Sequence, residues 1–263
     1  MTRSSSLGPW AEFGRQVGFI GAAVLLYFLV RGLTQGEAAV AVHNGHEVLA
    51  FEHRYGLDAE QWAQGLVIDH PWRVNLANWI YIWGHWPVIA ATLIWLHQKR
   101  RDDYLLLRNA MFLSGAIGLV IFATYAVAPP RLLGVGLDDT VTEHSNAYRV
   151  LQPPSLVNKY AAIPSLHVGW NLLVGVTLYR ASSRRLVRAF AIVSPMLMAV
   201  AVVVTANHYV IDGILGAGLA LAGLGLSVLI SPRMRELDRR LRMRHSHQNR
   251  PLIDDQSVNA PAD

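Results

Sequence analysis

The sequence predicts an all-α integral membrane protein: a six-transmembrane-helix bundle with one outer amphipathic helix. Hydrophobic residues make up 52% of the chain and charged residues only 16%, whereas a soluble domain carries about 25% charged residues. The apolar residues also gather in blocks of roughly 17 to 25, the length that crosses a hydrocarbon core of about 30 Å. The six expected spans are 17–33, 76–97, 109–127, 164–180, 187–205 and 210–230.

The basic residues predict the orientation of this bundle. Cytoplasmic loops of membrane proteins are enriched in lysine and arginine. When the loops are assigned to alternate sides, 17 of the 23 lysines and arginines fall on the side that holds both termini. Both termini are therefore expected in the cytoplasm. This distribution accounts for the net charge of +5 without a nucleic acid partner.

Three regions are expected along the chain. Residues 1–16 form a cytoplasmic N-terminus, residues 17–231 the membrane domain, and residues 232–263 a basic surface helix followed by a disordered cytoplasmic tail. The two long loops within the membrane domain, 34–75 and 128–163, lie on the outer side. The chain has no cysteine, which excludes disulfides and thiolate chemistry.

The two outer loops differ in their predicted structure. The first contains EAAVAVHNGHEVLAFEHRYGL, which predicts an amphipathic helix resting on the outer surface. The second contains APPRLLGVGLDDTV and QPPSLVNKYAAIPS, whose five prolines disfavour continuous helix. We interpret this second loop as a lid or gate, because long loops in compact proteins tend to be functional. The apolar face of the amphipathic helix is predicted to hold Ala38, Val42, Val48, Leu49 and Phe51.

Three polar motifs stand at span ends on the predicted outer side. They are APPRL after the third span, IPSLH at the start of the fourth, and NHYVID between the fifth and sixth. Ionisable residues within a membrane domain usually face a cavity and carry function. Because all three motifs fall on the same side, we expect them to form one site in contact with the cell exterior or periplasm.

The first two motifs suit the binding of a phosphate group. Arg131 offers a planar guanidinium that matches phosphate oxygens. Pro164 is typical of a first helical turn, whose outward N–H groups favour an anion. Ser165 either adds a hydroxyl to this anion site or caps the helix.

The histidines suit phosphoryl transfer. His208 and Asp212 are four residues apart, which places both on one helix face. A carboxylate in this position fixes the tautomer of the imidazole and leaves the other ring nitrogen able to attack. A second imidazole, His167, is placed to protonate the departing oxygen. One nucleophile, one acid and an anion site indicate transfer through a phosphohistidine, without a metal or another cofactor.

Three further residues are candidates for the cavity around the site. His85, in GHWP, either lines the cavity or hydrogen-bonds a neighbouring helix. Asn171, one turn after His167, is expected to make a packing hydrogen bond. Tyr209, which directly follows His208, is the third candidate.

These motifs resemble the signatures of the type-2 phosphatidic acid phosphatase superfamily, the membrane lipid-phosphate phosphatases and phosphotransferases. PSLH resembles the second signature, and HYVID the histidine and aspartate of the third. APPRL, IPSLHVGW and TANHYVID resemble more closely the branch of the inositol phosphorylceramide synthases, the aureobasidin-resistance-like proteins. The resemblance extends over about 76–230 and includes the six-helix layout. It implies a nucleophile, an orienting carboxylate, a general acid and a phosphate ligand at His208, Asp212, His167 and Arg131, respectively.

Two departures from the family pattern concern phosphate-binding cations. The common first signature has a lysine seven residues before its arginine, where this chain has Thr124. The third carries an arginine six residues before its histidine, where this chain has Val202. The synthase-like branch shows similar losses. Lys159 and Arg149, both in the second outer loop, are candidates to supply positive charge instead.

The expected activity is that of a membrane lipid phosphatase or phosphotransferase acting on a phospholipid or polyprenyl-type lipid phosphate at the outer leaflet. Two alternatives stay open. A synthase-type transferase would move a phospho-headgroup, such as phosphoinositol, to an alcohol acceptor, and the missing cations favour such a phosphodiester because it carries less charge. A non-catalytic protein would only bind lipid phosphate, although a binder has no need of an imidazole oriented by a carboxylate.

Overall fold

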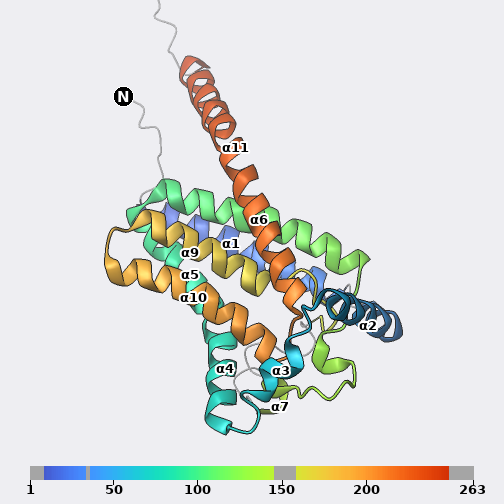
Figure 1. The fold of residues 1–263 in the computed structure, drawn as a ribbon. Helices are drawn as coiled ribbons and strands as arrows, with labels where there is room; N and C mark the ends of the chain where they lie inside the picture. Colours follow the sequence, from blue (N-terminus) through green and yellow to red (C-terminus); the bar gives the residue numbers. More distant parts are fainter. Residues whose placement is uncertain (1–8, 34–35, 145–157, 249–263) are drawn as a thin grey trace, which may run out of the picture.

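The computed structural model describes residues 9–33, 36–144 and 158–248, and the regular structure in these ranges is helical (Figure 1). Within them, a single β-bridge joins Val127 to Ala161. The elements are α1 (Pro9–Leu33), α2 (Ala38–Tyr55), α3 (Glu60–Gly65), α4 (Pro71–Trp83), α5 (Trp86–Lys99), α6 (Arg101–Thr124), η1 (Pro130–Leu132), α7 (Thr140–His144), α9 (Leu166–Ala181), α10 (Arg185–Val204) and α11 (Val210–Gln248).

Several of these helices are suited to a membrane. In the part of the chain that the structure describes, α6, α10 and the segment Val210–Ile230 of α11 are long and apolar enough to cross one, and α4 with α5 makes a fourth if this bent pair is one span. Helix α9 has 16 residues, fewer than the roughly 20 that a transmembrane helix needs to cross a bilayer. The chain is therefore an all-α protein with three or four candidate spans, and the arrangement of six spans stays a prediction.

The pair α4–α5 is bent by 40° at a short break. Pro87 is the second residue of α5 and has no N–H to donate to the carbonyl of Trp83, so the helical hydrogen bonds cannot continue through this point. His85 is the residue at the break that precedes α5. A histidine is thereby placed at a helix break, inside the region that we predicted as the second span.

Helix α9 packs against α5, α6, α10 and α11 and is buried almost all round, as expected of an apolar helix in the centre of a bundle. It approaches α11 very closely. A Cβ at Gly169 would overlap the carbonyl oxygen of Gly216, and a Cβ at Gly216 would overlap that of Ser165. Small residues allow such backbone contact between helices in membranes. These glycines set the distance between the helices that carry the candidate site.

Helix α2 packs on protein rather than only resting on a surface. Its buried residues, Ala41, Gly45, Val48 and Glu52, form one face, which contacts the segment that follows α6. Ala128 N donates to Ala41 O over 2.9 Å. Of the residues predicted on the apolar face, Val48 is buried against protein, whereas Phe51 is 46% exposed and Ala38 is also exposed. The contact of this helix with the membrane surface stays a prediction.

Helix α11 runs without a break from the last predicted span into the predicted basic helix and extends beyond the other helices in Figure 1. The expected boundary near residue 231 is thus not a helix end. The expected disordered tail falls mainly on residues 249–263, which lie outside the described residues.

Candidate active site

The site is built around the turn that joins α10 to α11. The carbonyl of Val202 accepts from the main-chain N–H groups of Asn207 and His208, each over 3.1 Å. Ala206 adopts a φ of 52°, in the left-handed region that residues with a Cβ seldom occupy. The chain thereby folds tightly over the end of α10 and places His208 just before α11.

Two acceptors fix the tautomer of His208. Its Nδ1 lies 2.9 Å from the carbonyl oxygen of Ala162 and 3.2 Å from Oδ2 of Asp212. A carbonyl and a carboxylate oxygen can only accept, so Nδ1 carries the proton and Nε2 keeps its lone pair. The histidine is 6% exposed. The chemistry available to it is that of a nucleophile or a base at Nε2.

Asp212 joins the two helices of the site. Its Oδ2 also accepts from the N–H of Tyr209 over 3.0 Å, so this third residue of α11 reaches back to the residue before the helix, as in half of a capping box. Its main-chain carbonyl accepts from Ser165 N over 3.0 Å. Asp212 is fully buried. One residue therefore orients the imidazole, caps α11 and attaches the start of α9.

His167 lies beside His208. Their ring centroids are 5.8 Å apart, with an angle of 55° between the ring planes. His167 is in the first turn of α9, and Tyr81 of α4 stacks on its ring at 4.6 Å. Residues from three distant parts of the sequence thus meet, and the two imidazoles are close enough to contact one phosphoryl group.

His85 and Asn171 support His167 from the other side. The His85 ring lies 4.3 Å from that of His167. The side-chain amide of Asn171 donates to the carbonyl of His167 over 2.9 Å and lies 3.1 Å from Nδ1 of His85. Because the first bond fixes the amide nitrogen, His85 Nδ1 accepts from it. Of the two interpretations of His85, a hydrogen bond to a neighbouring helix is present, and this bond involves the candidate site.

The backbone of Arg131 contacts the turn before His208, and its side chain forms an ion pair with Asp139. Its N–H donates to Ala206 O over 3.1 Å, which attaches APPRL to the turn before His208. Its Nε lies 3.0 Å from Oδ2 of Asp139. Both side chains are largely buried, with 9% and 19% exposed. A phosphate that binds this guanidinium must share it with, or take it from, Asp139.

The remaining predicted residues fall in different places. Ser165 is fully buried, and its Oγ accepts from Val168 N over 3.4 Å, so it caps α9. Tyr209 is fully buried, with its hydroxyl 2.8 Å from Ala128 O and 3.1 Å from Gly45 O. Lys159 is exposed. Arg149 lies outside the described residues.

Sequence reasoning missed four side chains. Tyr81 and Asp139 contact His167 and Arg131, as described above, and no pattern in the sequence distinguished them. Glu52 and Glu60 are buried and accept from main-chain N–H groups of α11. For Glu52 a signal existed: it shares the helix face of Ala41, Gly45 and Val48, and a carboxylate among small apolar residues needs a partner.

Fold and site together define a helical membrane protein with two adjacent imidazoles, one of them oriented by a buried carboxylate. The chain belongs to the PAP2 superfamily, whose sequence profile matches residues 46–226. A search of curated proteins and a search of solved structures each gave no match. Membership supports a phosphatase-type activity on lipid phosphates in general. Glu52 and Glu60 lie within the matched residues.

Proposed function

We propose that this protein is a lipid phosphatase or phosphotransferase that acts through a phosphohistidine on His208. The observation that carries the proposal is the pair of acceptors on Nδ1 of His208, because they leave Nε2 unprotonated beside a second imidazole. The substrate is a phospholipid or a polyprenyl-type lipid phosphate.

In the first step, Nε2 of His208 forms a bond to phosphorus while the ester P–O bond breaks. His167 gives its proton to the leaving alkoxide. The phosphohistidine ring carries a positive charge because Nδ1 stays protonated, and the carboxylate of Asp212 at 3.2 Å stabilises this charge. The N-terminal end of α9 favours the anionic phosphoryl oxygens.

In the second step, the oxygen of a water molecule attacks phosphorus and the P–N bond breaks. His167, now neutral, takes a proton from this water. Free phosphate leaves and His208 regains its starting tautomer. If an alcohol replaces water, the same step gives a phosphate ester of that alcohol and the enzyme is a transferase. The product is a phosphodiester when the donor is itself a phosphodiester, because the phosphohistidine then keeps the headgroup.

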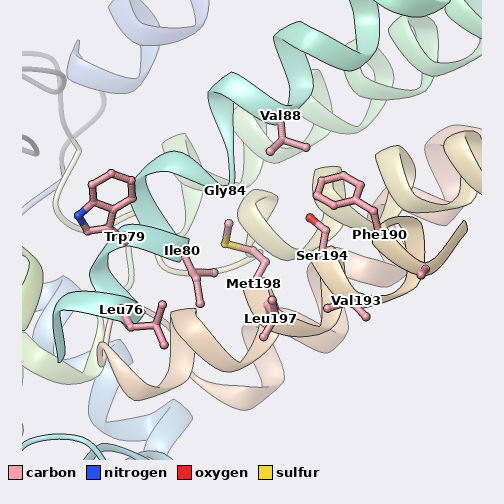
Figure 2. A pocket seen from close by; sticks show the side chains of 11 residues that line it. Leu76, Trp79, Ile80, Gly84, Val88, Phe190, Val193, Ser194, Leu197 and Met198 are labelled. Carbon is pink, nitrogen blue, oxygen red and sulfur yellow. The ribbon is translucent and has the colours of Figure 1, made fainter. Parts of the chain in front are cut away.

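An apolar groove supports a lipid as the substrate (Figure 2). It has a volume of about 500 Å³ and lies between the α4–α5 break and α10. Ile80 and Gly84 line it, and their chain neighbours Tyr81 and His85 contact His167. A hydrocarbon chain in this groove would therefore start near the general acid. The other labelled lining residues are Leu76, Trp79, Val88, Phe190, Val193, Ser194, Leu197 and Met198.

The ion pair between Arg131 and Asp139 favours the transferase as a second candidate. Asp139 offsets part of the charge of Arg131. The two positions where the family pattern has a cation supply no charge here. Thr124 donates its hydroxyl to Val120 O in its own helix, and Val202 is buried and apolar. A site with so little positive charge suits a phosphodiester with one negative charge better than a monoester with two. Asp139→Asn should then improve the binding of inorganic phosphate as an inhibitor by roughly fivefold, the effect of an ion pair of about 1 kcal/mol.

The test uses protein purified in detergent with a chelator, assayed against phosphatidic acid, a polyprenyl diphosphate and phosphatidylinositol. Phosphate release and headgroup exchange are followed in parallel. His208→Ala is the test variant, and His46→Ala, which removes an exposed histidine of α2, is the matched control. Release of phosphate that requires His208 identifies a phosphatase, whereas exchange without release identifies a transferase. Activity that survives in His208→Ala contradicts the mechanism, and neither signal in the folded protein favours a binder.

A further inference from the structure

The first turn of α11 has an unusual set of partners. Helices begin with main-chain N–H groups that have no acceptor within the helix. Here three consecutive N–H groups each meet a different carboxylate: Tyr209 N donates to Asp212, Val210 N donates to Glu60 over 2.9 Å, and Ile211 N donates to Glu52 over 2.7 Å. Two of these carboxylates come from outside α11.

The positions of Glu52 and Glu60 are explained by their hydrogen bonds to α11. They lie on α2 and α3, some 150 residues earlier in the chain. Glu52 is fully buried and Glu60 is 2% exposed. Burying a carboxylate is expensive unless hydrogen bonds compensate for the lost water. The hydrogen bonds to α11 provide that compensation, and they attach the two outer helices to the residues that directly follow His208 and Tyr209.

We propose that Glu52 and Glu60 are positioning residues of the active site, which hold the first turn of α11 and thereby fix His208 relative to Asp212 and His167. This inference rests on the proposed function of His208. Neither glutamate needs to contact the substrate. Their hydrogen bonds restrain the backbone at Val210 and Ile211, so a change in either would move the imidazole rather than remove a reacting group.

The same contacts assign the anion site to one helix. The three N–H groups at the start of α11 already donate to carboxyl oxygens, so they are not offered to a phosphate. Of the two helix starts, the N-terminal end of α9 therefore remains the candidate for holding the phosphoryl oxygens. The two helix starts are adjacent, because Ser165 N donates to Asp212 O, but they have different roles.

Glu52 lies in a cluster of acidic groups. The titratable groups that act on Glu52 are Glu60 of α3 and Asp212 of α11, and all three carboxyl groups act in turn on Tyr209. Burial, followed by the charge and hydrogen bond of Glu60 and the charge of Asp212, raises the pKa of Glu52 to about 8. Its Oε2 accepts no hydrogen bond from the described residues, and a proton on this oxygen would satisfy it, with Glu60 as acceptor. Glutamine at position 52 would reproduce the neutral state.

The test compares Glu52→Ala and Glu60→Ala with Glu52→Gln, which keeps the side-chain oxygen that accepts from Ile211. The matched control is Glu47→Ala, because Glu47 is on the same helix, with 67% of its side chain exposed. A misplaced nucleophile should lower kcat roughly 10- to 100-fold in both alanine variants, with KM nearly unchanged. Glu52→Gln and Glu47→Ala should keep kcat within about threefold. Unchanged kcat in Glu52→Ala, or a loss that is entirely in KM, would overturn the proposal.

A second measurement does not depend on catalysis. Amide hydrogen exchange at Val210 and Ile211 should accelerate about tenfold or more in Glu52→Ala and stay at the wild-type rate in Glu47→Ala. If the wild-type protein shows no turnover that requires His208, the proposed function fails, and this exchange still shows whether the glutamates hold the turn. Rapid exchange at these amides in the wild type would overturn the positioning role. If Glu52→Ala does not fold, the dependence of kcat on pH is compared between the wild type and Glu52→Gln. The wild type should lose kcat as the pH rises through about 8, and the variant should not.

Discussion

His208 shares its Nδ1 proton with the carbonyl oxygen of Ala162 at 2.9 Å, a shorter contact than the one with Asp212 at 3.2 Å. The main chain directly before the IPSLH segment thus holds the tautomer together with the carboxylate. In a histidine oriented by a carboxylate alone, loss of the negative charge lowers kcat by about 10⁴ because the wrong tautomer forms. Here a second acceptor remains when the carboxylate is removed.

Asp212→Asn should therefore reduce the rate of the first chemical step by only roughly 10- to 100-fold, because Ala162 keeps the proton on Nδ1. The loss reflects weaker stabilisation of the charged phosphohistidine. Single-turnover kinetics with a lipid phosphate measure this step. His208→Ala is the reference and should abolish it. An Asp212→Asn variant as inactive as His208→Ala would mean that Ala162 does not hold the tautomer.

His167→Gln should slow the release of an alkoxide roughly 10²- to 10⁴-fold, the usual contribution of a general acid. The same variant should cleave p-nitrophenyl phosphate at nearly the wild-type rate in the first step, because this leaving group needs no proton. The comparison of burst rates for the two substrates is the measurement. An equal loss on both substrates would contradict the acid role and indicate a structural role for the ring.

Gly216→Ala should abolish activity, because the new Cβ overlaps Ser165 O and forces α9 away from α11. The cost in unfolding free energy is expected to exceed about 2 kcal/mol, as for overpacking in a core. Gly218→Ala is the matched control: it lies in the same helix with open space around a Cβ and should be neutral or stabilising by up to about 1 kcal/mol. Thermal unfolding in detergent, with activity measured in parallel, distinguishes the two. Similar effects of the two substitutions would contradict the tight contact.

The stability of the protein should decline with pH in a way that requires Glu52. Its pKa is raised from 4.5 to about 8 by burial and by the neighbouring carboxylates, so folding takes up a proton between these values. The stability provided by the neutral carboxyl is complete below pH 4.5 and is lost as the pH rises through about 8. Relative to Glu52→Gln, the wild type should lose about 1 kcal/mol per pH unit in this window.

Thermal unfolding midpoints of the wild type and Glu52→Gln between pH 5.5 and 9 measure this difference. Glu47→Gln serves as the control for loss of an exposed carboxylate on the same helix. Parallel curves for the wild type and Glu52→Gln would show that Glu52 is ionised throughout, and the raised pKa would then be wrong.

The sequence by itself determined the class of protein and indicated the chemistry that we propose. Long apolar blocks must be helical, because backbone polar groups in lipid need partners within the segment. The spacing of His208 and Asp212 is local, so helix geometry alone places them together. The PSLH and HYVID motifs are also local, and the family they indicate is the one to which the chain belongs.

Only the tertiary structure decided which distant groups complete the site. Ala162 contributes a main-chain carbonyl, which no side-chain pattern encodes, and Glu52 and Glu60 contribute carboxylates from helices far from His208 in the sequence. The close contact of α9 and α11 at Gly169 and Gly216 depends on two backbones meeting, and neither sequence segment carries that information alone. Contacts across long separations arise from packing, and packing is a property of the whole chain rather than of any one stretch.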